Sequence, residues 1–406
     1  MGKVFFLNVR LSILILIVSN CKGGPNKPIG AVHADTPKQV VVSMPEPPAL
    51  LPYDSLSFVS VEQLKSSYGT KSVVFSKNMK MLYAMNLEGM SVYEFSQKSK
   101  QVQRIFKFRQ TPGTGWDYDT DRPIRSFEEK PVEAFLTNHD SIIWVSLHNA
   151  EGIVPIHLNA AQQQKKAISA TDKLVYLQDA NGTTLDSFYV PLIKTGKTPK
   201  VIACTSDDRV LLVSNWHSLD VSVLDLNANQ YPYGVVRTNI KVPGIPRGIV
   251  IDEAHQKSYV TIMGGTTLSV IDNKTWTKTG DIYVGSNPRH LLQDKKSRLY
   301  VSFNKTAQIG CVDPDSGKVL FTAATASQPR SMVLSKDQSH VFVTCYSGNK
   351  LNVFRIREDA FEKVADLDCA GNPVGVDVYE DNEYTEVWVC AYGTGLISVY
   401  RFKKYR

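Results

Sequence analysis

The sequence of 406 residues lacks most of the motifs that mark an enzyme or a nucleic-acid-binding protein. It has no GxSxG, HExxH, P-loop or dinucleotide-binding motif in a suitable context, so no catalytic signature stands out. Its 46 Lys and Arg against 39 Asp and Glu give a net charge of +7, but no long basic run concentrates that charge. No CxxC pair occurs among its six cysteines, which argues against a zinc site.

Long hydrophobic runs are also missing, and the N-terminal run at 11–18 has only eight residues. A membrane-spanning helix needs about 20 residues. Together with Lys3 and Arg10, the run therefore predicts a signal peptide over residues 1–20. Cys21 follows directly and resembles the acylated cysteine of the bacterial lipobox, although Asn20 departs from the usual Gly or Ala. The resemblance implies lipidation of Cys21, and a plain signal peptide with an incidental cysteine is the alternative.

The segment 21–54 carries seven prolines, which favour extended geometry and prevent a packed core. It predicts a tether that holds a domain away from a membrane. The five later cysteines lie mostly in apolar, strand-like runs and, being odd in number, do not all pair with one another. We expect buried thiols, with one disulfide left open. These five are Cys204, Cys311, Cys345, Cys369 and Cys390.

A repeat fills residues 55–406. Each copy begins at an anchor residue, and the steps between anchors from Pro199 onward are 47, 42, 41 and 44 residues. Every copy holds three apolar-alternating runs and a fourth before the next anchor, a pattern typical of four antiparallel strands. Seven copies predict an all-β, seven-bladed β-propeller. The anchors are Thr70, Pro131, Pro199, Pro246, Pro288, Pro329 and Pro373.

The last copy ends after its third strand, so its sheet needs one more strand to close the ring. We predict that residues 55–64 supply that outer strand, because an open ring would leave unpaired strand edges. Residues 39–43 are a second candidate.

Three segments carry a family resemblance: Tyr259-Val260-Thr261, Tyr300-Val301-Ser302 and Phe342-Val343-Thr344, each after a Pro-Arg pair and a turn. They resemble the YVTN family of β-propellers over about residues 66–404. The resemblance implies the fold. It leaves the function open, because related propellers include ligand-binding surface proteins, lactonase-like hydrolases and copper-bearing reductase domains.

In such propellers the first strand of each blade lines the central channel. The residue after each anchor is basic in five of the seven copies, namely Lys71, Lys200, Arg247, Arg289 and Arg330, whereas Val132 and Val374 fill the other two. A ring of these cations would attract an anion. Pairing of each cation with an acidic neighbour of the adjacent blade, or extension into solvent, is the alternative.

Two further features point to the same face. The turn after the second strand supplies a mixture of aromatic and amide residues that suits binding, with simple packing of turns as the alternative. The long connection at 110–130 carries Trp116 and Tyr118 among glycines and is our best candidate for partner contact. A polar excursion at 160–173 precedes an expected hairpin at 174–190 that turns at Asn181-Gly182. The turn residues are Asn86, His148, Trp216, Met263, Asn304, Tyr346 and Tyr392.

No column of the repeat gathers acids for a metal. Only His148, His217 and His290 lie near the face, too few for a copper cluster, so we expect no cofactor and no metal. The favoured function is a monomeric, lipid-anchored binding module on the outer membrane or cell surface, with a periplasm-facing position as the alternative. It would bind a protein, a glycan or an anionic small molecule. A lactonase-like hydrolase and a nucleic-acid-binding propeller are the rival hypotheses.

Overall fold

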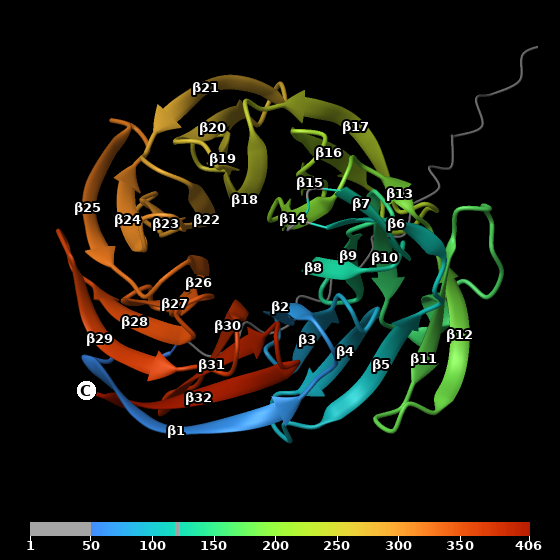
Figure 1. Cartoon of the computed structure of the whole chain (residues 1–406), viewed down its shortest axis with the longest axis horizontal. Coiled ribbons are helices and arrows are strands. Elements are labelled where there is room, and N and C mark those ends of the chain that lie inside the picture. Colours follow the sequence, from blue (N-terminus) through green and yellow to red (C-terminus); the bar gives the residue numbers. More distant parts are fainter. Residues whose placement is uncertain (1–49, 118–119, 121) are drawn as a thin grey trace, which may run out of the picture. The chain divides into compact units, whose positions relative to one another are not determined.

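The computed structural model describes residues 50–117, 120 and 122–406. These form seven antiparallel blade sheets arranged in a ring, and a separate two-stranded hairpin (Figure 1). The seven-bladed all-β propeller predicted from the repeat is therefore confirmed. Residues 1–49, with the predicted signal peptide, Cys21 and the candidate strand at 39–43, lie outside the described residues. Among the described residues, no helix has the length and apolar character that crossing a membrane requires.

Four blades each come from one uninterrupted repeat. In these sheets the two middle strands are buried on both sides, as in β27, because each blade packs between two neighbours. Outer strands alternate between exposed and half-buried residues, as in β21. The strands are β14 (Pro199–Cys204), β15 (Val210–Asn215), β16 (Asp220–Leu226), β17 (Gly234–Lys241); β18 (Ile245–Asp252), β19 (Lys257–Met263), β20 (Thr267–Asp272), β21 (Thr277–Tyr283); β22 (Pro288–Gln293), β23 (Leu299–Phe303), β24 (Gln308–Asp313), β25 (Lys318–Ala324); and β26 (Pro329–Leu334), β27 (His340–Cys345), β28 (Lys350–Ile356), β29 (Phe361–Asp368).

The last blade is closed by the N-terminal strand, as predicted. Strand β1 (Ser55–Lys65) pairs antiparallel with β32 (Leu396–Tyr405), from Ser55 opposite Tyr405 to Lys65 opposite Leu396. The blade also contains β30 (Pro373–Glu380) and β31 (Tyr384–Ala391). The two ends of the propeller chain thus share one sheet, which removes the open edge.

The first blade is larger than the repeat predicts. The expected hairpin forms as β11 (Lys173–Gln178) and β12 (Thr184–Val190), with Gly182 at φ 84° in its turn. It pairs with β5 and makes a six-stranded sheet. Phe188 of the hairpin packs edge-on against Phe106 of β5, which buries both rings. The other strands of this blade are β2 (Thr70–Phe75), β3 (Met81–Asn86), β4 (Ser91–Ser96) and β5 (Val102–Phe108).

The second blade has a short outer strand, β13 (Ile193–Lys194), beside β8 (Pro131–Thr137), β9 (Ile142–Leu147) and β10 (Gly152–His157). The excursion before the hairpin contains a single 3-10 turn, η1 (Ala160–Gln162), and is mostly exposed as expected. Its last residue differs: Lys173 is buried and forms an ion pair with Glu129 at 2.9 Å, because it already belongs to β11. The sequence suggested that Lys173 is exposed to solvent, and this expectation is wrong.

The hydroxyl of the Tyr-Val-Thr-like segments has a clear structural role. Thr261 Oγ1 accepts the Gly248 N–H at 2.7 Å within its own blade and donates to the Arg289 carbonyl at 3.0 Å in the next blade. Ser302 and Thr344 repeat both contacts. Each hydroxyl therefore fixes the backbone of the residue that follows the next anchor.

The described cysteines are all free thiols. Cys311, Cys345 and Cys390 are buried, and Cys204 and Cys369 are half-buried. Burial raises the pKa of Cys311 to about 11 and that of Cys345 to about 12, so both stay protonated at neutral pH. The expectation of buried thiols fits these positions, and Cys21 lies outside the described residues.

The first described residues of the predicted tether bind the propeller. Tyr53 is buried, stacks on His340 with ring centroids 5.5 Å apart, and lies beside the turn between β26 and β27. The Leu51 N–H donates to Asn382 Oδ1 at 3.0 Å in the turn between β30 and β31. The chain therefore enters the ring at the ends of these strands.

Asp377 joins the last blade to the first and makes stability depend on pH. Its carboxylate accepts the Phe75 N–H at 2.7 Å, and burial raises its pKa to about 6. Because the folded-state pKa lies above the unfolded value of about 3.9, the associated stability is present below that value and is lost as pH rises through about 6.

Asp377→Asn is therefore expected to be more stable than the parent by roughly 1–3 kcal/mol above neutral pH, and to lose that advantage in acid. Urea unfolding at about pH 4 and about pH 7.5 measures the difference, with the exposed Asp359→Asn as the matched control. A constant difference across this range would contradict the assignment.

Candidate anion-binding site

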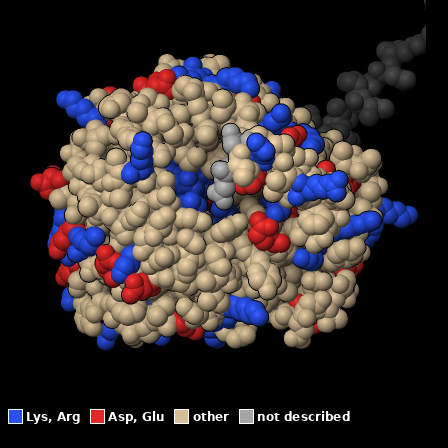
Figure 2. Space-filling model, viewed as in Figure 1, with Lys and Arg blue, Asp and Glu red and all other residues tan. Residues whose placement is uncertain are grey.

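A cavity of about 530 Å³ lies at the mouth of the central channel, and it gathers the residues that the sequence singled out. Figure 2 shows Lys and Arg atoms at the bottom of the central hollow. Most of the predicted site residues line it. Tyr118 lies outside the described residues, as do Asp119 and Asp121, and the turn residues Asn86, Met263 and Asn304 do not line the cavity. The lining residues from the predictions are Lys71, Trp116, His148, Lys200, Trp216, Arg247, Arg289, Arg330, Tyr346 and Tyr392.

Five cations, which we call the cation ring, come from the inner strands β2, β14, β18, β22 and β26: Lys71, Lys200, Arg247, Arg289 and Arg330. Lys200, Arg247 and Arg289 are only 3%, 5% and 6% exposed. Counting Lys130, six Lys or Arg side chains and two acids line the cavity in the part that the structure describes. One of these acids, Glu88, is 2.6 Å from Lys130 Nζ. The site is therefore strongly cationic.

Ion pairing with the adjacent blade, the alternative explanation, does not account for the ring. Within the described ranges the ring forms one ion pair, between Arg247 Nη2 and Glu133 Oε1 at 3.1 Å, and Glu133 belongs to β8, two blades away. The other two nitrogens of Arg247, Nε and Nη1, are buried without a hydrogen-bond partner among the described residues. A buried donor without an acceptor costs free energy that a bound anion would recover.

Residues of the turn column contact the cations of the ring directly. The Lys71 ammonium lies 4.5 Å from the Tyr392 ring centroid, Lys200 lies 4.4 Å from Trp216, and the Arg330 guanidinium lies 3.4 Å from Tyr346. Arg289 Nη1 donates to Met263 Sδ at 2.9 Å. The three aromatic side chains line the cavity, and their ring faces already contact the cations, which leaves less aromatic surface for a ligand.

Three turn residues, Asn86, Met263 and Asn304, do not line the cavity, although the sequence placed them in the turn column of the binding face. Asn86 is fully buried, and its side-chain oxygen accepts hydrogen bonds from Ser66 and Thr70. It therefore stabilises the fold. His290 is likewise structural, because its Nδ1 accepts the Met332 N–H of the next blade at 3.3 Å.

Burial and mutual repulsion act together on the ring. They lower the pKa of Lys71 to about 7 and that of Arg330 to about 10, with burial as the larger cause. They also lower the pKa values of Lys200 and Arg289 well below their ordinary range. The same causes lower the pKa of His148, whose Nε2 lies 3.3 Å from Lys200 Nζ. A neutral His148 can accept a hydrogen bond from this lysine.

The connection at 110–130, expected as an irregular loop, is a hairpin of β6 (Pro112–Asp117) and β7 (Arg122–Phe127). Its glycines and prolines concealed the strand pattern, because both are depleted in ordinary strands. Asn149 Nδ2 holds its base by donating to the Phe127 carbonyl at 2.8 Å. Trp116 reaches His217 of the third blade, with ring centroids 5.5 Å apart. The hairpin thus forms one wall of the cavity.

Sequence reasoning missed Lys130, Asn149 and Ile124, which also line the cavity. Lys130 directly precedes the anchor Pro131, and the column after each anchor passes over it. Lys130 could have been predicted from the sequence if the residue before each anchor had been considered together with the residue after it.

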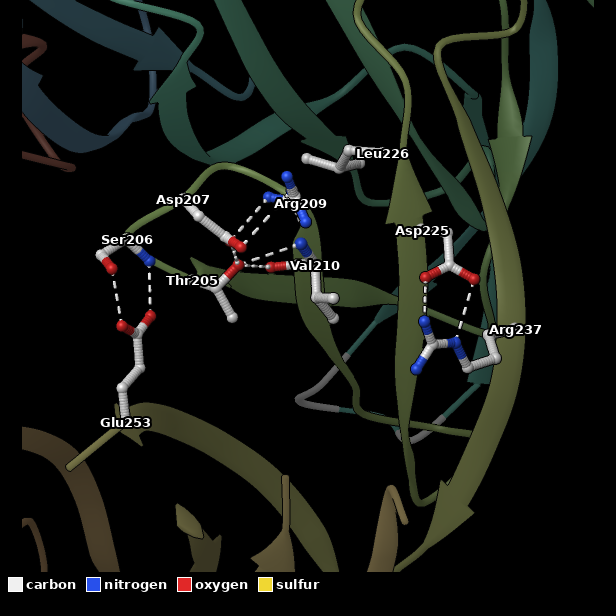
Figure 3. A pocket seen from close by; sticks show the side chains of 9 residues that line it. All are labelled: Thr205, Ser206, Asp207, Arg209, Val210, Asp225, Leu226, Arg237 and Glu253. Carbon is white, nitrogen blue, oxygen red and sulfur yellow. Dashed lines mark hydrogen bonds and ion pairs between the residues drawn. The ribbon is translucent and has the colours of Figure 1, made fainter. Parts of the chain in front are cut away.

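A second cavity of about 500 Å³ lies among the turns of the third and fourth blades. Figure 3 shows its charged side chains facing one another: Glu253 accepts from Ser206 Oγ at 2.6 Å, and Arg237 Nε donates to Asp225 at 2.9 Å. Its polar groups satisfy each other, so the channel mouth is the better candidate site. In the described part of the chain, no group of three or more His, Cys, Asp or Glu is placed to hold a metal.

Comparisons with known proteins support the fold. No family model matches the chain. Antigen Lp49 of Leptospira interrogans is 25% identical over 210 residues, a match that covers 47% of this chain and 45% of that protein. The chain therefore matches less than half the length of this curated relative.

Solved propellers cover most of the chain at low identity. Virginiamycin B lyase from Staphylococcus aureus has a TM-score of 0.58 and 11% identity, with 84% of this chain and 98% of that chain covered. A chain of the mitotic checkpoint complex has a TM-score of 0.58 and 12% identity, with 94% and 100% covered. The propeller of Cps50 (Swd1) from Myceliophteria thermophila has a TM-score of 0.56 and 12% identity, with 84% and 99% covered. At such identities these structures show the fold alone.

Proposed function

We propose that the protein is an exported, lipid-anchored propeller that binds a small anionic ligand through the cation ring. The proposal rests on Arg247, whose Nε and Nη1 are buried with no hydrogen-bond partner among the described residues and which lies among four further cations. A phosphate or carboxylate would accept these N–H groups and relieve the repulsion among the cations. Folding places the charges before the ligand arrives, so little ordering entropy is lost on binding.

The size of the cavity favours a compact ligand. A cavity of about 530 Å³ lies in the range typical of small-molecule sites. Cations cover the faces of Tyr346 and Trp216, which leaves less aromatic surface for stacking on a sugar. A nucleic-acid duplex fits poorly, because its phosphates would have to reach cations that are recessed and buried.

Export and anchoring rest on sequence and on one relative. The signal-peptide pattern ends at Cys21, and the curated relative from Leptospira carries the name antigen. Together they support a position on the cell surface or outer membrane. Incorporation of labelled palmitate into the full chain, and its loss in Cys21→Ser, is the direct test.

Replacing Lys200 by methionine or Arg330 by glutamine is expected to weaken the binding of inorganic phosphate by about 10- to 100-fold, because each change removes a charged hydrogen-bond donor. Isothermal titration at constant ionic strength measures the affinity. The matched control is Lys305→Met, an exposed lysine in the loop that follows β23. Absence of phosphate binding to the parent protein, or equal losses in the control, would refute the proposal.

A further inference from the structure

Lys71 differs from the other cations of the ring in its chemistry. Its side chain lines the cavity and is half-buried, and its ammonium rests on the Tyr392 ring. No carboxylate of the described residues forms an ion pair with it. Lys200, the other lysine of the ring, is more deeply buried and is already engaged by His148. Lys71 is therefore the primary amine best placed to meet a ligand.

The groups around Lys71 come from every neighbouring blade and are mostly positive. Among its strongest electrostatic influences, the acid Glu133 acts against the cations Arg330, Arg289 and Arg247. Two further acids, Glu88 and Asp117, line the same cavity. A desolvated lysine beside other cations loses its proton more readily, which is how catalytic lysines become nucleophilic. Its pKa of about 7 means that a large share of the amine is neutral at neutral pH. The charged or titratable groups around it and in the same cavity are Glu88, Asp117, Lys130, Glu133, His148, Lys200, Arg247, Arg289, Arg330, Tyr346, Cys390 and Tyr392.

We propose that Lys71 is a carbonyl-capturing amine, which forms an imine with an aldehyde whose anionic group is held by the arginines of the cation ring. The inference rests on the proposed anion site. The neutral amine attacks the carbonyl carbon and a C–N bond forms. The carbonyl oxygen then leaves as water with the two protons of the amine, so amine and aldehyde give imine and water, and no oxidant or reductant takes part.

The geometry allows a single ligand to place its anionic group at the arginines and its carbonyl group at Lys71. Lys71 and the arginines line the same cavity, whose volume of about 530 Å³ accommodates a ligand with both groups. Binding of the anionic group would hold the aldehyde beside the amine, so the condensation becomes effectively intramolecular. The arginines do not form stable imines, which leaves Lys71 as the reacting group.

Pyridoxal 5′-phosphate is a suitable probe, because it carries an aldehyde and a phosphate. Pyridoxine 5′-phosphate keeps the phosphate but has a hydroxymethyl group in place of the aldehyde, and pyridoxal keeps the aldehyde without the phosphate. We expect one equivalent of imine, seen by its absorption, trapped with borohydride and located at Lys71 by mass spectrometry. We expect pyridoxal to react at least about 10-fold more slowly, because it lacks the charged group that the arginines bind.

Lys71→Arg keeps the positive charge but has no primary amine, so the trapped adduct should disappear, whereas Lys305→Met should leave it unchanged. If pyridoxine 5′-phosphate binds but pyridoxal 5′-phosphate forms no imine at Lys71, this inference is overturned and the proposed function stands. An adduct spread over surface lysines, or equal rates for pyridoxal and its phosphate, would also overturn it. If neither phosphate compound binds, the proposed anion site itself fails.

Discussion

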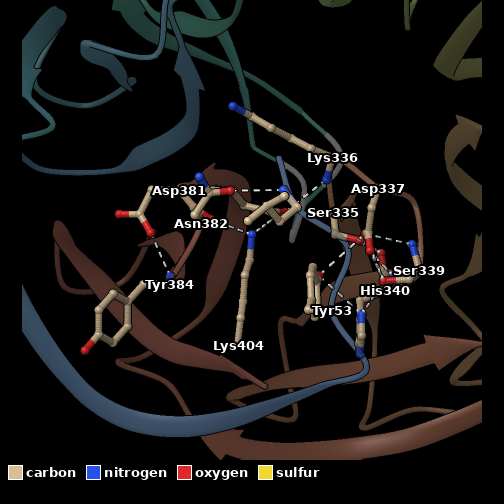
Figure 4. Close-up of polar contacts among 12 residues, drawn as sticks. Tyr53, Ser335, Lys336, Asp337, Ser339, His340, Asp381, Asn382, Tyr384 and Lys404 are labelled. Carbon is tan, nitrogen blue, oxygen red and sulfur yellow. Dashed lines mark hydrogen bonds and ion pairs between the residues drawn. The ribbon is translucent and has the colours of Figure 1, made fainter. Parts of the chain in front are cut away.

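Replacing Lys404 by methionine is expected to lower the free energy of unfolding by about 3–5 kcal/mol, because it leaves a buried carboxylate unpaired. Lys404 Nζ lies 2.7 Å from Glu380 Oε2, and the two side chains are 1% and 0% exposed. The same ammonium donates to the Asp381 carbonyl at 2.8 Å and lies beside Tyr53 (Figure 4). This ion pair therefore links the C-terminal strand to the turn where the N-terminal segment docks.

Urea unfolding of three variants separates the ion pair from general damage to the strand. Lys403→Met changes the exposed neighbour on β32 and should alter stability by less than about 0.5 kcal/mol. Lys404→Met combined with Glu380→Gln should recover most of the loss, because the carboxamide is neutral and still accepts the Lys336 N–H. If the double variant is as unstable as the single one, lost packing and not the unpaired charge is the cause.

Replacing Arg289 by methionine is expected to raise the unfolding free energy of the ligand-free protein by about 2–4 kcal/mol, and to weaken phosphate binding. Arg289 is 6% exposed, and its guanidinium donates a hydrogen bond to the thioether of Met263, a weak acceptor. The lowered pKa shows that its environment disfavours the charge, yet a guanidinium stays charged at neutral pH. The free protein carries that cost until an anion binds.

Unfolding with and without phosphate tests both parts of this prediction. The parent should gain stability as phosphate is added, by the linkage between binding and folding, and Arg289→Met should gain much less. Lys305→Met should behave like the parent in both conditions. A large loss of stability in ligand-free Arg289→Met would mean that this arginine stabilises the fold. The idea that it lowers the stability of the free protein in order to bind an anion would then be wrong.

The repeat made the fold predictable because each blade hides its apolar residues in the same way. Alternation around Tyr259 and Tyr300 places a buried strand in each copy, and the missing fourth strand of the last copy points to residues 55–64. The partner of the 174–190 hairpin was not predictable. A sequence pattern tells which side of a strand is buried, but the free edge of β5 becomes visible only when the sheets are assembled.

The site was predictable in part for the same reason. The position after each anchor identified the cation ring, because one step of the repeat always leads to the channel mouth. Contacts between different blades could not be predicted from the sequence. Arg247 forms an ion pair with Glu133 two blades away, and Arg289 donates to Met263 of the adjacent blade. No local sequence pattern encodes these contacts. The hairpin wall with Trp116 was hidden by its glycines.

Tyr53 and Leu51 dock on one side of the propeller, and the cavity opens on the other. These residues grip the turns β26–β27 and β30–β31, whereas Lys71 and Tyr392 mark the other ends of the strands, where the cavity opens. The N-terminal segment therefore leaves the mouth of the cavity uncovered where it joins the propeller, and a partner that held this segment would not block access of a solute to the cation ring.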